Sequence, residues 1–361
     1  MPLRPREYIT KLAPYEWEAM ASDVAAAAGI PESQVVRFDT NTPPWPPVAW
    51  ERTVLDLPRL PANEYPHPSN EPLRSALAGR FGVKPQQVVI TCGADEALFL
   101  VASVYLGPGR AAVAIDPTFS MFRVVTESVG GSLIKIPADA NWDLPLEPHL
   151  DAIKHPEVSV VWLCSPNNPT GRLLRGERVE AAIRAATDAL VVLDEAYAEI
   201  SGESLASLVL AAPNAALVRT FSKGYGLAGA RVGYLIANPE VARIIESVRL
   251  PQNMTTFGIA AACRALADQD GLNERVQMIV AERERLSREL KQRGWEISPS
   301  AANFLLSRPP QPAVQVSEWL QLGGLIARSY PGHERLNDWL RLSVRSPEEN
   351  DRLLSRLDSM R

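Results

Sequence analysis

Lys223 and Arg231 are the residues whose types and spacing most clearly suggest chemistry. They lie in the stretch RTFSKGYGLAGARVGY at 219–234, where Ser222 precedes the lysine and the arginine follows eight residues later. A lysine amine can bond covalently to an aldehyde cofactor, and an arginine beside it can hold a phosphate group. A lysine next to glycine is more often a solvated loop residue, so other segments must supply the remaining parts of such a site.

A second segment could complete a phosphate site. TCGADEA at 91–97 joins an apolar run to a helical pattern through a tight Gly-Ala turn. Free N–H groups at a helix N-terminus bind anions, because the helix dipole and the donors both favour negative charge. The amides of Ala94 and Asp95, the hydroxyl of Ser222 and the guanidinium of Arg231 would then form one set of phosphate donors.

Short apolar runs alternate with helical patterns from about residue 88 to residue 236. This alternation predicts an α/β fold with a mainly parallel sheet that is covered by helices on both faces. Ligands of such sheets bind at the carboxyl ends of the strands, and most of the motifs described here fall at those ends or just after them. The predicted strands are VVIT at 88–91, AAVAI at 111–115, SLIKI at 132–136, VSVVWLC at 158–164, LVVLD at 190–194, ALVRT at 216–220 and VGYLI at 232–236.

After about residue 250 the pattern changes to long charged helices and short strands. A chain of 361 residues would ordinarily divide into about two domains. The predicted second domain is α+β, with strands near 303–307, 325–328 and 340–344. The predicted organisation is an N-terminal arm at 1–46 that packs with the small domain, a large domain at 47–250 and a small domain at 251–361.

Composition excludes some classes of partner. A net charge of -5 and a pI near 5.6 argue against nucleic acid or an anionic membrane, because either would need a concentrated basic face. No apolar run has signal-peptide or membrane-spanning length, which predicts a cytoplasmic protein. Cys92, Cys164 and Cys263 are far apart in apolar sequence, which predicts buried thiols and no disulfide, and no metal-ligand spacing is present.

Three motifs together carry a family resemblance. The pattern SKxxxLxGxRxGY around Lys223 resembles the lysine motif of fold-type I pyridoxal 5'-phosphate (PLP) enzymes, the aspartate aminotransferase superfamily, and so do SPNNPTG at 165–171 and DEAY at 194–197. The resemblance implies a large domain whose seven-stranded, mainly parallel sheet lies between helices, with a smaller α+β domain at the C-terminus. It also implies PLP held by Lys223 as an internal aldimine.

The resemblance assigns the remaining cofactor contacts. Asn168 would donate to the phenolic oxygen of PLP, and Tyr197 would share that oxygen. Asp194 would face the pyridine nitrogen and keep it protonated, which makes the ring an electron sink. Phe119, in DPTFSMF at 116–122, would stack on the ring where close relatives commonly carry tyrosine. Taken singly, these residues are equally typical of turns, a helix cap and core packing.

Two more positions follow from the same resemblance. Tyr65, in NEYPHP at 63–68, would reach across a dimer interface to the PLP phosphate of the partner subunit, which implies a homodimer. Arg341 lies inside the apolar run DWLRLSV at 338–344. A guanidinium buried there needs an anionic partner, and the superfamily uses the equivalent arginine to clamp the substrate α-carboxylate.

Within the superfamily the chain is most similar to histidinol-phosphate aminotransferases. By that analogy Arg328 and Tyr15 approach the distal end of the substrate, where an arginine would suit a phosphate. Asn41 belongs with the substrate-binding residues as well. The similarity extends from Tyr8 to about Asp351 and is clearest in LAPYEW, NEYPHPSNEPLRSALA, SPSAANFLLSR, GGLIARSY and WLRLSVRSPEENDRLL.

One landmark departs from that family. The relatives usually carry NENPYGP, whereas this chain has NTPPWPP at 41–47. Thr42 therefore replaces a glutamate close to the substrate side chain, and Trp45 adds apolar area. Either the imidazole of histidinol phosphate is recognised by other groups, or the substrate is a different amino acid.

The predicted function is therefore a PLP-dependent aminotransferase. The first hypothesis is transamination between histidinol phosphate and 2-oxoglutarate, as in histidine biosynthesis, with Lys223 moving the proton. The alternatives are an aromatic or other amino-acid aminotransferase and a threonine-phosphate decarboxylase. A PLP-dependent transcriptional regulator is disfavoured, because the first 46 residues leave no room for a basic DNA-binding domain.

Overall fold

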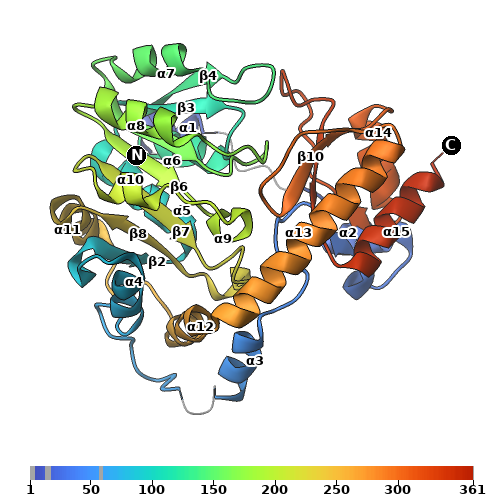
Figure 1. Cartoon of the computed structure of the whole chain (residues 1–361), viewed down its shortest axis with the longest axis horizontal. Coiled ribbons are helices and arrows are strands. Elements are labelled where there is room, and N and C mark those ends of the chain that lie inside the picture. Colours follow the sequence, from blue (N-terminus) through green and yellow to red (C-terminus); the bar gives the residue numbers. More distant parts are fainter. Residues whose placement is uncertain (1–4, 13–17, 57–59, 361) are drawn as a thin grey trace, which may run out of the picture.

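The chain folds into a large α/β unit and a smaller α+β unit that lie side by side (Figure 1). The structure is a computed structural model that describes residues 5–12, 18–56 and 60–360. Helix α13 (Gln269–Gln292) runs diagonally from the large unit into the small one. The predicted combination of an α/β unit with a smaller α+β unit is confirmed.

Seven strands from the described residues form the large sheet, in the order β2-β8-β7-β6-β5-β3-β4. Only β8 runs antiparallel to its neighbours within this sheet. The central strands are buried on both faces, which explains why their sequences are continuous apolar runs without alternation. The strands are β2 (Val88–Thr91), β3 (Ala111–Asp116), β4 (Ser132–Pro137), β5 (Val158–Cys164), β6 (Leu190–Asp194), β7 (Ala215–Thr220) and β8 (Gly233–Ala237). All seven coincide with the predicted runs to within a residue.

Helices cover both faces of this sheet and bury a separate apolar cluster on each side. One cluster contains side chains of α5 (Gly93–Tyr105), α6 (Ser120–Ser128) and α11 (Pro239–Val248). The opposite cluster contains side chains of α4 (Leu73–Phe81), α7 (Leu146–Ile153), α8 (Gly176–Ala185), α10 (Ala206–Leu210) and α12 (Thr256–Ala267). The remaining short elements of this unit are α1 (Glu7–Thr10), α3 (Val48–Leu55), α9 (Ala198–Ser201), and the 3-10 turns Pro85–Gln87 and Ala228–Ala230.

The small unit combines the C-terminal residues with the N-terminal arm. Strands β9 (Glu296–Ile297), β10 (Phe304–Arg308) and β12 (Leu340–Ser343) form an antiparallel sheet in the order β12-β10-β9. Strand β1 (Val36–Arg37) pairs in parallel with β11 (Leu325–Ile326), so the arm is part of this unit. The helices are α2 (Ala21–Ala28), α14 (Ala313–Gln321) and α15 (Pro347–Asp358), with a 3-10 turn at Glu32–Gln34.

The passage between the two units lies within α13. Helix α12 packs against α3 and α4 of the large unit. Leu272, near the start of α13, belongs to a core cluster of the large unit, whereas Leu286 and Leu290 near its end belong to the core of the small unit. The division into 1–46, 47–250 and 251–361 stays a prediction, because the residues just after 250 pack on the large unit.

Two further properties concern the described residues alone. None of their helices is both long enough and apolar enough to cross a membrane. They also contain no group of three or more histidine, cysteine or acidic residues arranged to hold a metal ion. Cys92, Cys164 and Cys263 are free thiols.

Candidate active site

A cavity of about 560 Å³ opens at the carboxyl ends of the central strands, between the two units. Parallel strands of a covered sheet place their ligand sites at this edge. The large unit contributes the ends of β5 and β6 and the loop after β7, while the small unit contributes Arg328 and Arg341. Of the predicted site residues, the cavity is lined by Asn41, Ala94, Asp95, Phe119, Asn168, Asp194, Tyr197, Ser222, Lys223, Arg231, Arg328 and Arg341.

Lys223 lies in the tight loop that follows β7. The loop is closed by backbone bonds from Phe221 N to Val232 O (2.9 Å) and from Leu227 N to Phe221 O (2.9 Å). The Lys223 Nζ donates to the main-chain oxygen of Thr40 at 3.2 Å. Burial, together with the nearby positive charge of Arg341, lowers the pKa of the lysine to about 8. A larger fraction of this amine is therefore neutral near pH 7 than in an exposed lysine.

Asp194 ends strand β6 and is almost completely buried, with 2% of its surface exposed. Its Oδ1 accepts a hydrogen bond from the Ala196 amide at 2.9 Å. Burial raises the pKa of this carboxyl to about 7 despite that bond. A carboxylate in such a setting is stabilised by a cation or an N–H donor, and the cavity beside it has room for a ligand that carries one.

Two further hydrogen-bonded pairs line the cavity with Lys223. Asn41 Nδ2 donates to the Tyr197 hydroxyl at 3.1 Å. Arg341 Nη1 donates to Asn168 Oδ1 at 2.6 Å, which leaves the two N–H groups of that amide for another acceptor. The Tyr197 ring packs edge-on against Phe304, with 5.2 Å between centroids. Burial raises the pKa of the Tyr197 phenol, so this residue acts as a hydrogen-bond donor at neutral pH.

The predicted phosphate donors converge at the N-terminus of α5. Gly93 adopts φ +77°, and a Cβ at this position would lie 2.6 Å from Arg231 Nη2. Glycine is favoured here because the positive φ strains other residues, and a Cβ would also displace the guanidinium. Arg231 Nη2 also donates to Asp95 Oδ2 at 3.1 Å, a side-chain contact that the sequence did not indicate. The hydroxyls of Ser222 and Thr220 lie 2.9 Å apart at the end of β7.

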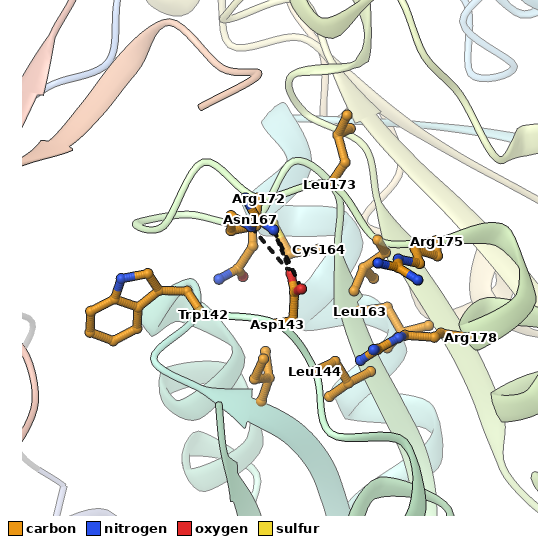
Figure 2. Close-up of a pocket in the computed structure, with 12 residues that line it drawn as sticks. Trp142, Asp143, Leu144, Leu163, Cys164, Asn167, Arg172, Leu173, Arg175 and Arg178 are labelled. Atoms are coloured by element: carbon orange, nitrogen blue, oxygen red, sulfur yellow. Dashed lines mark hydrogen bonds and ion pairs between the residues drawn. The ribbon is translucent and has the colours of Figure 1, made fainter. Parts of the chain in front are cut away.

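Hydrogen bonds from the neighbouring residue Asn167 stabilise the turn that carries Asn168. Asn167 Nδ2 donates to Pro117 O and to Thr170 Oγ1, both at 3.0 Å. A pocket of about 20 Å³ lies beside this turn. Figure 2 shows its lining residues, among them the ion pair between Arg172 and Asp143. That volume holds about one water molecule, so this pocket is too small to bind the substrate or cofactor.

Phe119 also lines the large cavity, where it stands just before α6 and packs edge-on against Phe122 with 5.9 Å between centroids. One predicted residue is not brought to the cavity in this single chain. Tyr65 is 81% exposed and is not among the residues that line it. Tyr15 falls in the segment 13–17, outside the described residues. Their predicted roles stay predictions.

The NTPPWPP segment divides between the cavity wall and a partly buried turn near Gly226. Thr42, which stands in place of the family glutamate, lines the cavity, and its hydroxyl lies 2.9 Å from that of Thr40. Trp45 is not among the lining residues, and its main-chain oxygen faces Gly226 instead. The expected gain of apolar area from Trp45 therefore falls outside the cavity wall.

Among the charged residues of the cavity that sequence reasoning missed are Glu18, Arg37 and Asp39. Arg37 and Asp39 are two apart in extended chain and so share one face, which was a usable indication. No sequence pattern indicated Glu18, because its partner Arg328 is 310 positions away in the sequence.

Comparison with known proteins identifies the family. Residues 33–357 match the model of the family described as aminotransferase class I and II. The chain belongs to this family. It is therefore an aminotransferase, an enzyme that transfers an amino group between an amino-acid-type donor and a 2-oxo acid.

Individual aminotransferases match over nearly the whole chain. The chain is 35% identical to histidinol-phosphate aminotransferase 2 of Nitrosospira multiformis, covering 97% of this chain and 90% of that protein. It is 36% identical to the aromatic amino acid aminotransferase of Cutibacterium acnes, covering 89% and 91%. Among solved structures, histidinol-phosphate aminotransferase from Sinorhizobium meliloti in complex with pyridoxal-5'-phosphate matches with a TM-score of 0.89 and 29% identity, covering 98% and 96%.

Proposed function

We propose that this aminotransferase uses PLP bound to Lys223 and transfers the amino group of histidinol phosphate to 2-oxoglutarate. The observation that carries the proposal is the convergence of Lys223, Asp194, Asn168 and Arg231 on one cavity. Histidinol-phosphate aminotransferases of several bacteria are 34–35% identical to the chain over 95–97% of its length.

The described residues fit PLP in four respects. The cradle at Gly93, which a Cβ would fill, brings helix amides and the Arg231 guanidinium together for a phosphate. Asp194 is a buried carboxyl beside the cavity, suited to a protonated ring nitrogen. The amide of Asn168 and the hydroxyl of Tyr197 can both donate to a phenolic oxygen. Phe119 would supply a face for the ring.

The chain's own groups then have separate tasks. When bound, PLP supplies a ring that withdraws electrons from the substrate Cα. Lys223 Nζ, with its pKa lowered to about 8, would take the proton from that carbon and return it to the C4′ carbon of PLP. Asp194 would hold the positive charge of the ring nitrogen, while Arg341 orients the substrate through its anionic group.

Both predicted substrates need a guanidinium, but for different anions. Histidinol phosphate carries a phosphate ester where an amino acid carries its α-carboxylate, and 2-oxoglutarate carries carboxylates. Arg341 and Arg328 are paired through their main chains, with N to O distances of 3.1 and 2.9 Å, and both line the cavity. This pair of adjacent arginines is the proposed site for the anionic group.

An aromatic amino acid is the second candidate donor. It is favoured by Thr42, which removes the family's glutamate from the cavity wall, and by the 36% identity to an aromatic amino acid aminotransferase. The threonine-phosphate decarboxylase alternative has weaker support. L-threonine-O-3-phosphate decarboxylase from Porphyromonas gingivalis is 22% identical with a TM-score of 0.77, a likeness of fold alone.

We also propose a homodimer that works in the cytoplasm. Tyr65, Leu55 and Leu250 are large apolar or aromatic side chains with 71–81% of their surface exposed, and a partner subunit would cover them. In such a dimer Tyr65 would reach the partner's cofactor phosphate. The three free thiols suit a reducing compartment.

The proposal is tested by absorption spectroscopy. PLP-loaded protein should show the absorption band of a lysine-bound cofactor, and Lys223→Ala should abolish it. Lys135→Ala is the matched control, because Lys135 lines the same cavity but pairs with Asp116 at 3.7 Å. An unchanged band in Lys223→Ala would refute the covalent role.

The substrate is tested on the same band. Histidinol phosphate, phenylalanine and threonine phosphate are added separately, and the rate at which each bleaches the band ranks them. Release of carbon dioxide from threonine phosphate would identify a decarboxylase instead.

A further inference from the structure

Two ion pairs occupy the small-unit end of the cavity. Arg37 Nε and Nη2 donate to the two carboxylate oxygens of Asp39 at 2.7 and 2.6 Å. Arg328 Nη1 lies 3.3 Å from Glu18 Oε1. All four side chains line the cavity. The charges of Arg37 and Arg328 are thus each opposed by a carboxylate.

Arg341 differs from these two arginines in its partners. Its Nη1 donates to the amide oxygen of Asn168 at 2.6 Å, and its Nη2 donates to the main-chain oxygen of Asp39. Both acceptors are neutral, and the buried Nε has no hydrogen-bond partner among the described residues. Arg341 therefore keeps its full positive charge for an incoming anion.

Glu18 is held firmly beside Arg328. Only 11% of its side chain is exposed, and its Oε1 also accepts a hydrogen bond from the Ser329 amide at 3.1 Å. Burial raises the pKa of this carboxyl, while the charge of Arg328 and the Ser329 amide act against the rise. An amide and a guanidinium on one carboxylate favour its charged form.

The position of Glu18 matters differently for carboxylates and phosphates. A carboxylate has two oxygens, and one guanidinium can bind both of them. A phosphate ester has three terminal oxygens and up to two charges, so it gains from a second guanidinium. Arg328 is adjacent to Arg341, but Glu18 neutralises it and would repel a dianion more strongly than a monoanion.

We propose that Glu18 is a specificity-determining residue that biases this anion site toward carboxylates and against phosphate esters. The inference rests on one part of the proposed function, namely that Arg341 and Arg328 bind the anionic group of the substrate. Glu18 then lowers the affinity for histidinol phosphate relative to amino acids and 2-oxo acids. The enzyme needs both kinds of anion in turn, and Glu18 sets the balance between them.

The test uses two unreactive ligands that differ only in their anion. 3-Phenylpropionate carries a carboxylate and 2-phenylethyl phosphate a phosphate, and neither has an amine that could react. Their Kd values for PLP-loaded protein are measured by calorimetry. Glu18→Gln keeps the size of the side chain and an oxygen for the Ser329 amide. It should tighten the phosphate about tenfold and the carboxylate about threefold at most.

A control and a converse variant sharpen the result. Glu289→Gln removes the same charge from a carboxylate on α13 that pairs with Arg293, away from the cavity, and should leave both Kd values within about twofold. Arg328→Ala should act in the opposite direction and weaken the phosphate more than the carboxylate. A ratio of the two Kd values that is unchanged in Glu18→Gln, or shifted toward the carboxylate, overturns the proposal.

Loss of folding would not obscure the answer. If Glu18→Gln melts early, Glu18→Asp withdraws the charge by one methylene and should shift the ratio in the same direction, and an unchanged ratio there refutes the role. Binding of these ligands requires no turnover. A protein that binds them with the expected ratio but transfers no amino group would refute the proposed function and leave the assignment of Glu18 intact.

Discussion

Asp194 and Glu195 are neighbours in the chain, yet their carboxyl groups are treated in opposite ways. Both are buried, with 2% and 1% of their surface exposed. Glu195 Oε2 accepts two hydrogen bonds from Arg219, at 2.6 and 3.1 Å, and Oε1 accepts the Leu205 amide at 2.5 Å. Asp194 has the Ala196 amide and otherwise faces the cavity.

The same contrast separates the two basic residues of the lysine segment. Arg219 is bonded to Glu195, to Glu199 at 3.2 Å and to Ser204 at 2.7 Å. Lys223, four residues later, donates to a neutral main-chain oxygen. Arg219 and Glu195 are thus matched to each other within the protein, whereas Asp194 and Lys223 have no charged hydrogen-bond partner among the described residues.

The largest expected effect on stability comes from the buried ion pairs of Arg219. Arg219→Met would leave Glu195 and Glu199 buried without their cation, and removing one member of a buried ion pair costs about 3–5 kcal/mol. We expect a loss of that size in the free energy of unfolding, measured by urea denaturation. As a control, Arg184→Met breaks an exposed pair with Glu180 and should cost less than about 1 kcal/mol. Equal losses in the two variants would contradict the contrast.

Asp194→Asn should have the opposite effect and increase the free energy of unfolding at pH 8. The pKa of Asp194 is raised to about 7, so the folded chain binds more protons than the unfolded chain between about pH 4 and 7. Its contribution to stability is therefore lost as the pH rises through 7. Three pH units correspond to about 4 kcal/mol, so we expect the cofactor-free variant to gain about 2–4 kcal/mol at pH 8.

At pH 4 the same substitution should give no gain, because Asp194 is protonated in the folded state there. Aminotransferase activity should fall at every pH. A variant that is less stable than the parent at pH 8 would show that Asp194 has a charged partner after all. Asp194 would then be paired within the protein, as Glu195 is.

The smallest effect concerns the pH dependence of cofactor capture. An amine must be neutral to attack an aldehyde, and burial lowers the pKa of Lys223 to about 8. The rate at which cofactor-free protein binds PLP should therefore rise with pH and reach half its maximum near pH 8. Stopped-flow absorbance measures this rate. A midpoint near 10.5, the value of an exposed lysine, would mean that Lys223 is not desolvated.

The fold and the placement of Asp194, Asn168 and Lys223 at one cavity could be predicted because their determinants are local. Each central strand is a continuous apolar run, and Asp194, Asn168 and Lys223 each lie within a short motif after such a strand. Side chains placed at the ends of adjacent parallel strands must meet. Arg341 was found for a similar reason, as a charge inside an apolar strand.

The substrate end could not be predicted in the same way. Glu18 meets Arg328, and Lys223 meets Thr40 O, through the N-terminal arm, which docks on the small unit partly by pairing β1 with β11. No local pattern encodes a pairing between residues about 290 positions apart. The exchange of a family glutamate for Thr42 was visible in the sequence, but Trp45 could not be placed until the turn near Gly226 was known.

The pairing of β1 with β11 also dictates an order of events during synthesis. Val36 and Arg37 leave the ribosome early, whereas their partners Leu325 and Ile326 are made about 290 residues later, which takes roughly 15–60 s at typical rates. Asn41 waits longer still, for Ser343, whose hydroxyl it contacts at 2.8 Å. The arm that brings Thr40 to Lys223 therefore cannot dock before nearly the whole chain has been translated. A nascent fragment that ends before Leu325 could form the large sheet, but the N-terminal arm would not yet line the cavity.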